Sequence, residues 1–293
     1  MSEQFTPASI VVGIDGSRTA VRAALWAIDE AISRDIPLHL VAVANSPGAN
    51  SSVANSPAAN SPAERADAEL AVRAAAAAVA ATGRPVDLDS RVLDGEPTLI
   101  LLQHSGTAAM VCVGAVGRRH FDRNRLGSTA GALVAAAHCP IAVVRGDDES
   151  EAEPGGWVVV ELDETPDSAA VLQFGVAEAR LRNAPLRVLG AWQSRYTDVH
   201  DSHAVADGNR LVRSQLDRRL SQWRHLYPDL DAKPVAIHGS ALNYLSKHAG
   251  EIQLVVVGAP NATGVGELLG PMGLTTLNDT NCTIVVIDRQ RLL

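Results

Sequence analysis

The run Ser9-Ile-Val-Val-Gly-Ile-Asp15 decides the fold, because it returns later in the chain as Trp157-Val-Val-Val-Glu-Leu-Asp163. The two aspartates are 148 residues apart, and the same offset relates Trp26 to Phe174, Glu30 to Glu178, and Pro37-Leu38 to Pro185-Leu186. Two further blocks recur at offsets a few residues shorter: Ala109–Gly114 with Gln253–Gly258, and Cys139–Val144 with Cys282–Ile287. A nearly constant offset over several blocks indicates two copies of one unit.

Each copy alternates short apolar runs with amphipathic stretches. In copy one we expect strands at 9–14, 38–44, 86–92, 109–114 and 141–145, and helices at 17–34, 63–82, 96–105 and 127–137. In copy two we expect strands at 156–162, 186–192, 232–237, 253–258 and 283–288. Apolar strands that do not alternate with polar residues are typical of a parallel sheet covered on both faces. The sequence therefore predicts an α/β protein with two tandem, doubly wound, five-stranded parallel-sheet domains of Rossmann-like type.

The 293 residues divide into an N-terminal domain at 1–145, an acidic linker at 146–156 and a C-terminal domain at 157–293. The stretch from Asn45 to Ala63 repeats Asn-Ser-Pro three times and carries no charge. Such a composition forms no core, so we expect a flexible insertion after the second strand.

Composition excludes several classes of protein. The net charge of −8 and an aromatic content of 3% argue against nucleic-acid binding, which needs cations and stacking surfaces. The start of the chain has no basic and apolar leader, and no apolar run reaches the ~20 residues of a membrane span. The three cysteines form no C-x-x-C pair and are expected to be buried thiols in a reducing compartment. We expect a cytoplasmic protein with no membrane contact.

The segment after the fourth strand of copy one carries the chemistry. It opens with Gly114-Ala-Val-Gly117 at a strand end and closes with Gly127-Ser128-Thr129 before a helical run. Glycines let backbone N–H groups approach an anion, and a helix N-terminus with hydroxyl groups favours phosphate.

Four arginines and one acidic residue lie between these glycines, which gives a local charge of +3 in an acidic protein. They are Arg118, Arg119, Arg123 and Arg125, with Asp122. The Walker pattern does not fit, because no lysine occupies its place. The dinucleotide fingerprint does not fit either, because Gly13-Ile-Asp-Gly16-Ser17 lacks its glycine spacing. A different phosphate loop is indicated.

The pattern G-x-x-G, nine residues, then G-[ST], after a first strand ending Val12-Gly13-Ile14-Asp15, resembles the ATP-binding branch of the universal stress protein family. The resemblance covers nearly the whole chain as a tandem pair. It implies that Asp15 contacts the adenine or ribose side of ATP and that the backbone near Val41 and Val43 holds the base. It also implies that residues of the loop wrap the phosphates: Gly114, Gly117, Gly127 and Ser128. Thr129 adds a second hydroxyl at the helix N-terminus, and Arg118 lies where a side chain could reach the phosphates, although the motif does not assign it a role. We expect Mg²⁺ to accompany ATP.

Copy two departs from this pattern. Its loop reads Gly258-Ala-Pro-Asn261, and Pro271-Met272 replaces the Gly-Ser pair. Proline has no N–H and methionine no hydroxyl, although Asp163 is retained. We therefore predict that copy two does not bind ATP in the manner of the family.

Three functions are compatible with these residues. The first is a nucleotide-responsive stress regulator with an unknown protein partner, and a cyclic nucleotide is a related ligand. The second is a slow ATPase or phosphoryl-transfer enzyme in which Asp15 or Ser128 assists, and the third is a scaffold that binds no nucleotide. The resemblance also implies that domains pair through their last strands, at 141–144 and 284–287. A tandem chain can make this pairing internally and still form the homodimer that we expect. A metal site at Asp198–His203 is disfavoured, because the polar composition of a loop explains that segment.

Overall fold

The computed structural model describes residues 8–45, 62–117, 126–146, 156–163, 168–193, 202–258, 268, 270, 273 and 282–287. Its contacts divide the chain into two units, one from Met1 to Asp148 and the other from Glu149 to Arg289. The division falls within the stretch 146–156 that the sequence marks as a linker.

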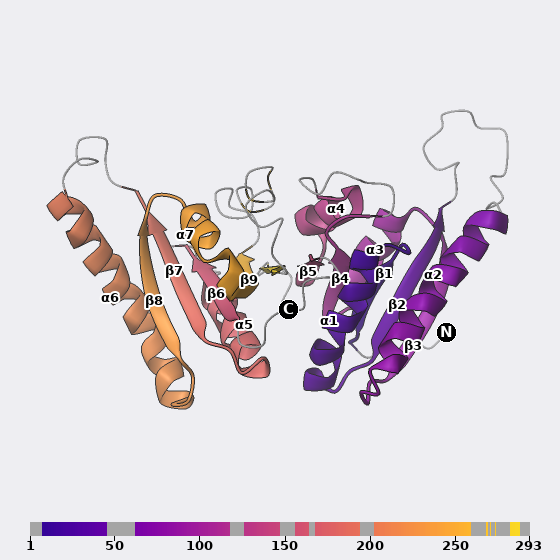
Figure 1. Cartoon of the computed structure of the whole chain (residues 1–293), viewed down its shortest axis with the longest axis horizontal. Coiled ribbons are helices and arrows are strands. Elements are labelled where there is room, and N and C mark those ends of the chain that lie inside the picture. Colours follow the sequence, from indigo (N-terminus) through magenta and orange to yellow (C-terminus); the bar gives the residue numbers. More distant parts are fainter. Residues whose placement is uncertain are drawn as a thin grey trace. The chain divides into compact units, whose positions relative to one another are not determined.

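Unit 1 is an α/β unit whose strands are all parallel (Figure 1). Its elements in chain order are β1 (Ile10–Ile14), α1 (Arg18–Arg34), β2 (Leu38–Asn45), α2 (Pro62–Ala81), β3 (Leu88–Gly95), α3 (Pro97–Ser105), β4 (Met110–Gly114), α4 (Ser128–Ala136) and β5 (Ile141–Val144). The strand order within its sheet is β3-β2-β1-β4-β5. The order reverses beside β1, which creates the topological switch point at which α/β proteins bind ligands.

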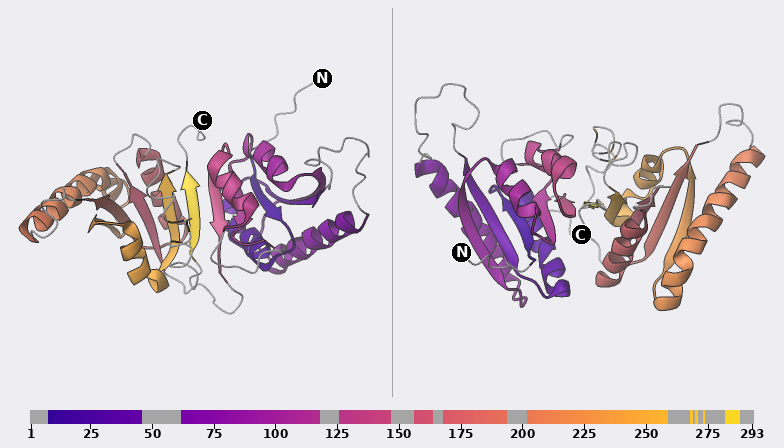
Figure 2. Two further views of the ribbon diagram at one scale, coloured as in Figure 1. Left: turned by 90° about the horizontal axis from the view of Figure 1, so that it is seen from above. Right: turned by 180° about the vertical axis from the view of Figure 1, so that it is seen from behind.

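The helices of unit 1 cover both faces of its sheet. Helices α1 and α2 pack together on one face, and α3 and α4 on the other (Figure 2, left). Helix α1 begins at Ser17, whose hydroxyl accepts a hydrogen bond from the N–H of Ala20 at 3.2 Å. Right-handed connections place the first two helices on one face and the later two on the opposite face.

The central strands are apolar and buried, as predicted, whereas β3 at the edge is only half-buried. The sequence predicts this edge strand at 86–92, but it extends from Leu88 to Gly95, because it pairs with β2 as far as Asn45 opposite Gly95. The sequence Leu-Asp-Gly at its end resembles a turn, and pairing with β2 overrides that local preference. At the two ends of the expected insertion, Asn45 ends β2, and Pro62 and Ala63 begin α2. The rest of the insertion lies outside the described residues.

Unit 2 repeats the arrangement with strands in the order β10-β9-β6-β7-β8, all parallel. Its elements are β6 (Trp157–Leu162), α5 (Ser168–Leu181), β7 (Leu186–Trp192), α6 (Ser202–Leu226), β8 (Ala232–His238), α7 (Ala241–Lys247), a short 3₁₀ turn (Ala249–Glu251), β9 (Ile252–Gly258) and β10 (Thr283–Ile287). The predicted fold class is therefore confirmed: each unit contains a five-stranded parallel sheet of Rossmann-like type.

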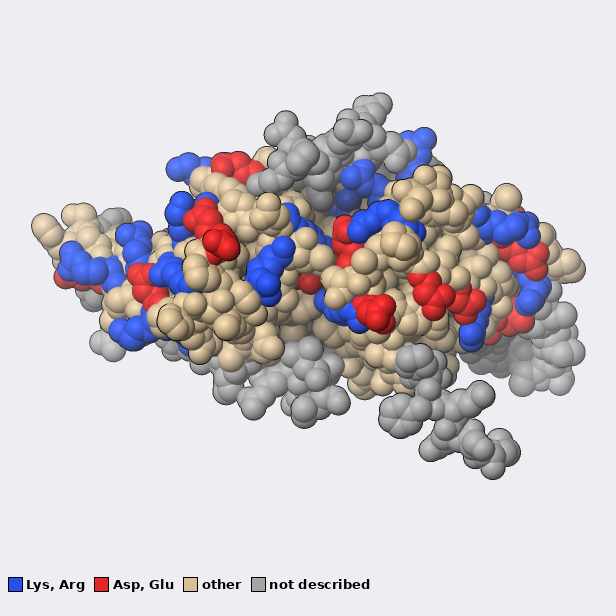
Figure 3. Space-filling view, turned by 90° about the horizontal axis from the view of Figure 1, so that it is seen from below, with Lys and Arg blue, Asp and Glu red and all other residues tan. Residues whose placement is uncertain are grey.

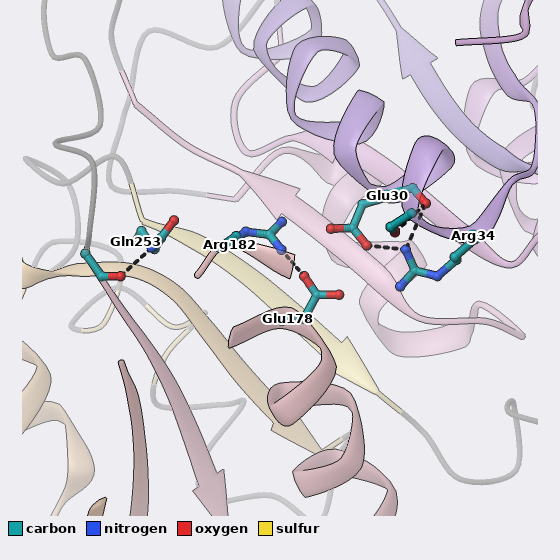
Figure 4. A network of polar contacts seen from close by, with 7 residues as sticks. Glu30, Arg34, Glu178, Arg182 and Gln253 are labelled. Atoms are coloured by element: carbon teal, nitrogen blue, oxygen red, sulfur yellow. Dashed lines mark hydrogen bonds and ion pairs between the residues drawn. The ribbon is translucent and has the colours of Figure 1, made fainter. Parts of the chain in front are cut away.

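The repeat extends to a buried ion pair in each first helix. Glu30 in α1 pairs with Arg34 one turn later, and Glu178 in α5 pairs with Arg182 at the same spacing (Figure 4). Both carboxylates are fully buried, with exposed side-chain fractions of 0% and 1%. A buried charge is tolerated when it is paired, so each glutamate and its arginine form one structural element.

The surface and the cysteines agree with the composition. On the face drawn in Figure 3, Lys and Arg are interspersed with Asp and Glu across the described residues. All three cysteines are buried thiols, as predicted. Within the described part of the chain, no helix combines the length and the apolar character that crossing a bilayer requires.

Candidate functional site: a cavity at the strand ends of unit 1

A cavity of about 470 Å³ lies in unit 1 at the carboxyl ends of β1, β2 and β4. Residues at the strand ends and residues of the helices α1, α2, α3 and α4 line it. Its volume is in the range of small-molecule sites, and its position is where α/β sheets bind ligands. The lining includes three carboxylates, Asp15, Glu64 and Asp67, and no Lys, Arg or His among the described residues.

One corner of the cavity is formed by the loops that follow β1 and β4. Oδ1 of Asp15 accepts a hydrogen bond from the N–H of Ser17 at 2.9 Å. A Cβ atom added at Gly117 would lie 2.9 Å from Oδ2 of Asp15, so a larger residue there would require the carboxylate to move. Asp15 is exposed, so its carboxylate can accept hydrogen bonds from a ligand as well.

The end of β4 is held against the first turn of α1. The hydroxyl of Thr19 donates a hydrogen bond to the carbonyl oxygen of Val116 at 2.6 Å. A Cβ atom at Gly114 would lie 2.4 Å from Oγ1 of Thr19 and 2.8 Å from its backbone carbonyl carbon. This close contact fixes the path of the loop from Gly114 to Gly117, which forms one edge of the cavity.

The N-terminus of α4 forms the opposite edge. Gly127 occupies the N-cap position with φ −58°, and its N–H donates to the carbonyl oxygen of Ala115 at 2.9 Å. Ser128 and Thr129 begin the helix and line the cavity. The first N–H groups of a helix have no partner within it and carry the positive end of the helix dipole. This edge can therefore bind an anion such as phosphate.

The other end of the cavity lies between β2 and α2. β1 ends at Ile14, opposite Ala42, whereas β2 continues to Asn45 beside β3 alone. Val41, opposite Gly13, and Val43, beyond the end of β1, both line the cavity. Small residues of α2, Ala68 and Ala71, leave space above them. Apart from the carboxylates of Glu64 and Asp67 on α2, this end is apolar and suits a planar ring, whereas the α4 end suits an anion.

Eight of the nine residues predicted for the site line this one cavity: Asp15, Val41, Val43, Gly114, Gly117, Gly127, Ser128 and Thr129. Arg118 and the other arginines of the loop lie outside the described residues. The contributions of α2 and α3 were not predicted, namely Glu64, Asp67, Ala68, Ala71, Pro97 and Leu101, and neither was the role of Thr19. The sequence around these residues is ordinary for a helix. Only the packing of the helices on the sheet places them near the strand ends.

The corresponding region of unit 2 is built differently. Trp192 at the end of β7 donates its indole N–H to Oδ1 of Asn209 at 2.8 Å, and its ring lies 4.7 Å from that of His238. A Cβ atom at Gly208 would lie 2.1 Å from the indole, so the ring packs directly against α6 at this glycine. The space between the strand end and the helix start therefore holds a side chain in unit 2.

The remaining predicted features of unit 2 are only partly described. Asp163 follows β6 and is exposed, and its carbonyl oxygen lies 3.4 Å from a guanidinium nitrogen of Arg219. Gly258 ends β9, but among the described residues a Cβ atom there would meet only Val171, at 3.4 Å. Asn261, Pro271 and Met272 lie outside the described residues, as does most of the segment Asp198–His203. Among described residues, no group of three potential metal ligands is found.

Comparison with known proteins gives consistent similarities. A model of the universal stress protein family matches residues 8–145. The chain is 41% identical over 294 residues to Universal stress protein Rv2028c of Mycobacterium tuberculosis H37Rv, with 100% of both chains covered. It is 35% identical to Universal stress protein Rv2624c of the same organism, with 97% of each covered. The crystal structure of a universal stress protein from Archaeoglobus fulgidus superposes with a TM-score of 0.67 at 13% identity, covering 97% of each chain, which shows a shared fold.

Proposed function

Because the chain belongs to the universal stress protein family, we propose that unit 1 binds ATP and that the protein is a nucleotide-responsive stress regulator. The observation that carries the proposal is the cavity at the strand ends, which has a helix N-terminus suited to an anion at one end and the largely apolar surface of Val41, Val43, Ala68 and Ala71 at the other. A nucleoside triphosphate has the same two parts. The cavity also lies at the switch point of the sheet, which is where α/β proteins bind ligands.

In this proposal the triphosphate lies along Gly117, Gly127 and Ser128, where the N–H groups of the first turn of α4 and the hydroxyl of Ser128 can donate hydrogen bonds. Asp15 accepts from the ribose, since its carboxylate is exposed beside the glycine loop. The base lies over Val41 and Val43. Mg²⁺ accompanies the phosphates, and the oxygens of Asp15 and Ser128 are of the hard type that this ion prefers. Arg118 is proposed to reach the phosphates.

We propose that one nucleotide binds per chain. In unit 2 the indole of Trp192 fills the region between the end of β7 and the start of α6. Its loop also lacks the glycine and hydroxyl pattern of unit 1. Unit 2 then serves as a partner surface in a cytoplasmic regulator. The proposed assembly is a homodimer, with domains pairing through their apolar last strands, β5 and β10.

Calorimetric titration of nucleotide-stripped protein with ATP and Mg²⁺ tests the proposal. We expect one site per chain and a loss of about tenfold or more in affinity for the double variant Gly127→Ala/Ser128→Ala. A Cβ atom at Gly127 would lie 3.5 Å or more from its described neighbours, so this variant should fold normally while the added methyl group obstructs the phosphate edge.

Asp163→Ala in unit 2 is the matched control and should retain wild-type affinity. Two sites per chain would contradict the asymmetry between the units. Absence of binding in the wild-type protein would overturn the proposal and favour a scaffold function. Competition by a cyclic nucleotide in the same titration shows whether the triphosphate is needed.

A further inference from the structure

Glu64, in the first turn of α2, has an unusual carboxylate. The residue lines the cavity, and within the described part of the chain its Oε2 atom is buried and has no hydrogen-bond partner. A carboxylate near a helix N-terminus is electrostatically favourable. That interaction does not satisfy a buried acceptor oxygen, which costs free energy until a donor reaches it.

Asn209 occupies the same position in unit 2. Glu64 and Asn209 each lie seventeen residues before the last residue of their helices, Ala81 and Leu226. The buried faces agree with this register, because counting from the same ends pairs Ala71 with Leu216 and Ala75 with Leu220. The two side chains therefore occupy equivalent positions on equivalent helices.

In unit 2 this position binds an aromatic N–H donor. Oδ1 of Asn209 accepts the indole N–H of Trp192 at 2.8 Å, and the ring lies against Gly208 and 4.7 Å from the ring of His238. Trp192 lies six residues after the first residue of β7, and the residue at that place in β2 is Ala44. Ala44 is buried and small, so unit 1 has the acceptor and the adjacent cavity but supplies no ring of its own at this point.

Building on the proposed binding of ATP, we infer that Glu64 is a specificity-determining residue that accepts a hydrogen bond from the exocyclic amino group of adenine. The base supplies in unit 1 the planar N–H donor that Trp192 supplies in unit 2. Guanine has a carbonyl oxygen in place of this amino group. That oxygen would face the carboxylate and leave two buried acceptors without a proton between them, so guanine is rejected.

The test compares ATP with purine riboside triphosphate, which is ATP without its exocyclic amino group, by calorimetry on the full chain. We expect the wild-type protein to prefer ATP by about tenfold, as a hydrogen bond to a charged acceptor predicts. Glu64→Ala should bind both ligands with nearly equal affinity. Glu64→Gln should retain most of the preference, since its amide oxygen still accepts a hydrogen bond, as Asn209 does.

Glu69→Ala is the control on the same helix, because Glu69 pairs with Arg65 and Arg73 away from the cavity. It should retain the full preference for ATP. An equal loss for both ligands in Glu64→Ala would overturn the inference, because the amino group would then not be the contact. If Glu64→Ala instead changed the preference for ATP over deoxyadenosine triphosphate, the contact of Glu64 would be with the ribose. That result would also overturn the inference. Failure of the wild-type protein to bind any of these ligands would overturn the proposed function itself, whereas ATP binding that ignores Glu64 would overturn this inference alone.

Discussion

The two units have the same framework and differ where their strands end. The strand order is the same, and both first helices carry the buried glutamate–arginine pair. At the carboxyl ends, however, unit 1 has a cavity of about 470 Å³, whereas unit 2 places the indole of Trp192 between its second strand and the helix that follows. The framework determines where a ligand can bind, and the residues at the strand ends determine whether one does.

Glycine illustrates how this difference arises. Gly114 and Gly258 end the equivalent strands β4 and β9. At Gly114 the backbone lies against Thr19 so closely that no side chain fits, whereas among the described residues Gly258 meets only Val171, at an ordinary distance. The close contact in unit 1 positions the loop that borders the cavity. A glycine can thus be required in one copy and dispensable in the other.

The largest expected effect follows from this pair of glycines. Gly114→Ala should lower the free energy of unfolding by about 2–3 kcal/mol, because the new methyl group overlaps the side chain and backbone of Thr19. ATP affinity should fall as the loop shifts. Gly258→Ala should change stability by less than about 0.5 kcal/mol. Urea unfolding followed by circular dichroism, together with calorimetry, measures both effects. Equal destabilisation by the two substitutions would contradict the difference drawn between the strand ends.

A smaller loss is expected when the indole of unit 2 is removed. Trp192→Ala should cost about 2 kcal/mol, less than a fully buried tryptophan, because the ring is only partly buried. The substitution removes the contacts of the ring with Gly208 and His238 and leaves Asn209 without its donor.

Trp192→Phe separates these contributions, since it retains a ring but removes the N–H and should cost about 1 kcal/mol. Urea unfolding of both variants provides the values. If Trp192→Phe were as stable as the wild-type protein, the indole N–H would have no role, and the comparison between Asn209 and Glu64 would lose its energetic support.

Much of the fold could be predicted because the signals are local or repeated. The recurrence of Ile10–Ile14 in the second half, and the apolar strands, were sufficient for the parallel sheets and their helices. The end of β3 was predicted less well, because pairing with β2 extends it through a turn-like Leu-Asp-Gly sequence. Local propensity alone does not reveal such pairing between strands.

The site was predictable where glycine and hydroxyl residues follow a fixed spacing, as in Gly114, Gly127 and Ser128. Glu64 could not be predicted, because nothing in a stretch of helix distinguishes a carboxylate that lines a cavity from one that is solvated. Thr19 was also missed, since its partner Val116 lies 97 residues further along the chain. Contacts of this range depend on which strands are neighbours, and a single sequence does not state that directly.

The smallest expected effect concerns the caps of two equivalent helices, α3 and α7. Glu96 caps α3 by accepting hydrogen bonds from the N–H groups of Thr98 and Leu99, at 3.1 and 2.8 Å, whereas the uncharged hydroxyl of Ser240 caps α7. Partial burial works against ionisation of Glu96, but the N–H donors outweigh it and lower the pKa of this carboxyl below its usual value. Its charge therefore stabilises the folded state above the unfolded pKa of about 4.3, and the benefit is lost as the pH falls through the lower folded pKa.

Glu96→Gln should accordingly cost about 0.5 kcal/mol at pH ~7 and almost nothing at pH ~3. Ser240→Ala, whose cap does not titrate, should cost about 1 kcal/mol, with no dependence on pH. Urea unfolding across this pH range measures both differences against the wild-type protein. If Glu96→Gln lowered the free energy of unfolding equally at acid pH, the charge of Glu96 would contribute nothing to this cap. The N-termini of α3 and α7 would then be capped by the same uncharged mechanism.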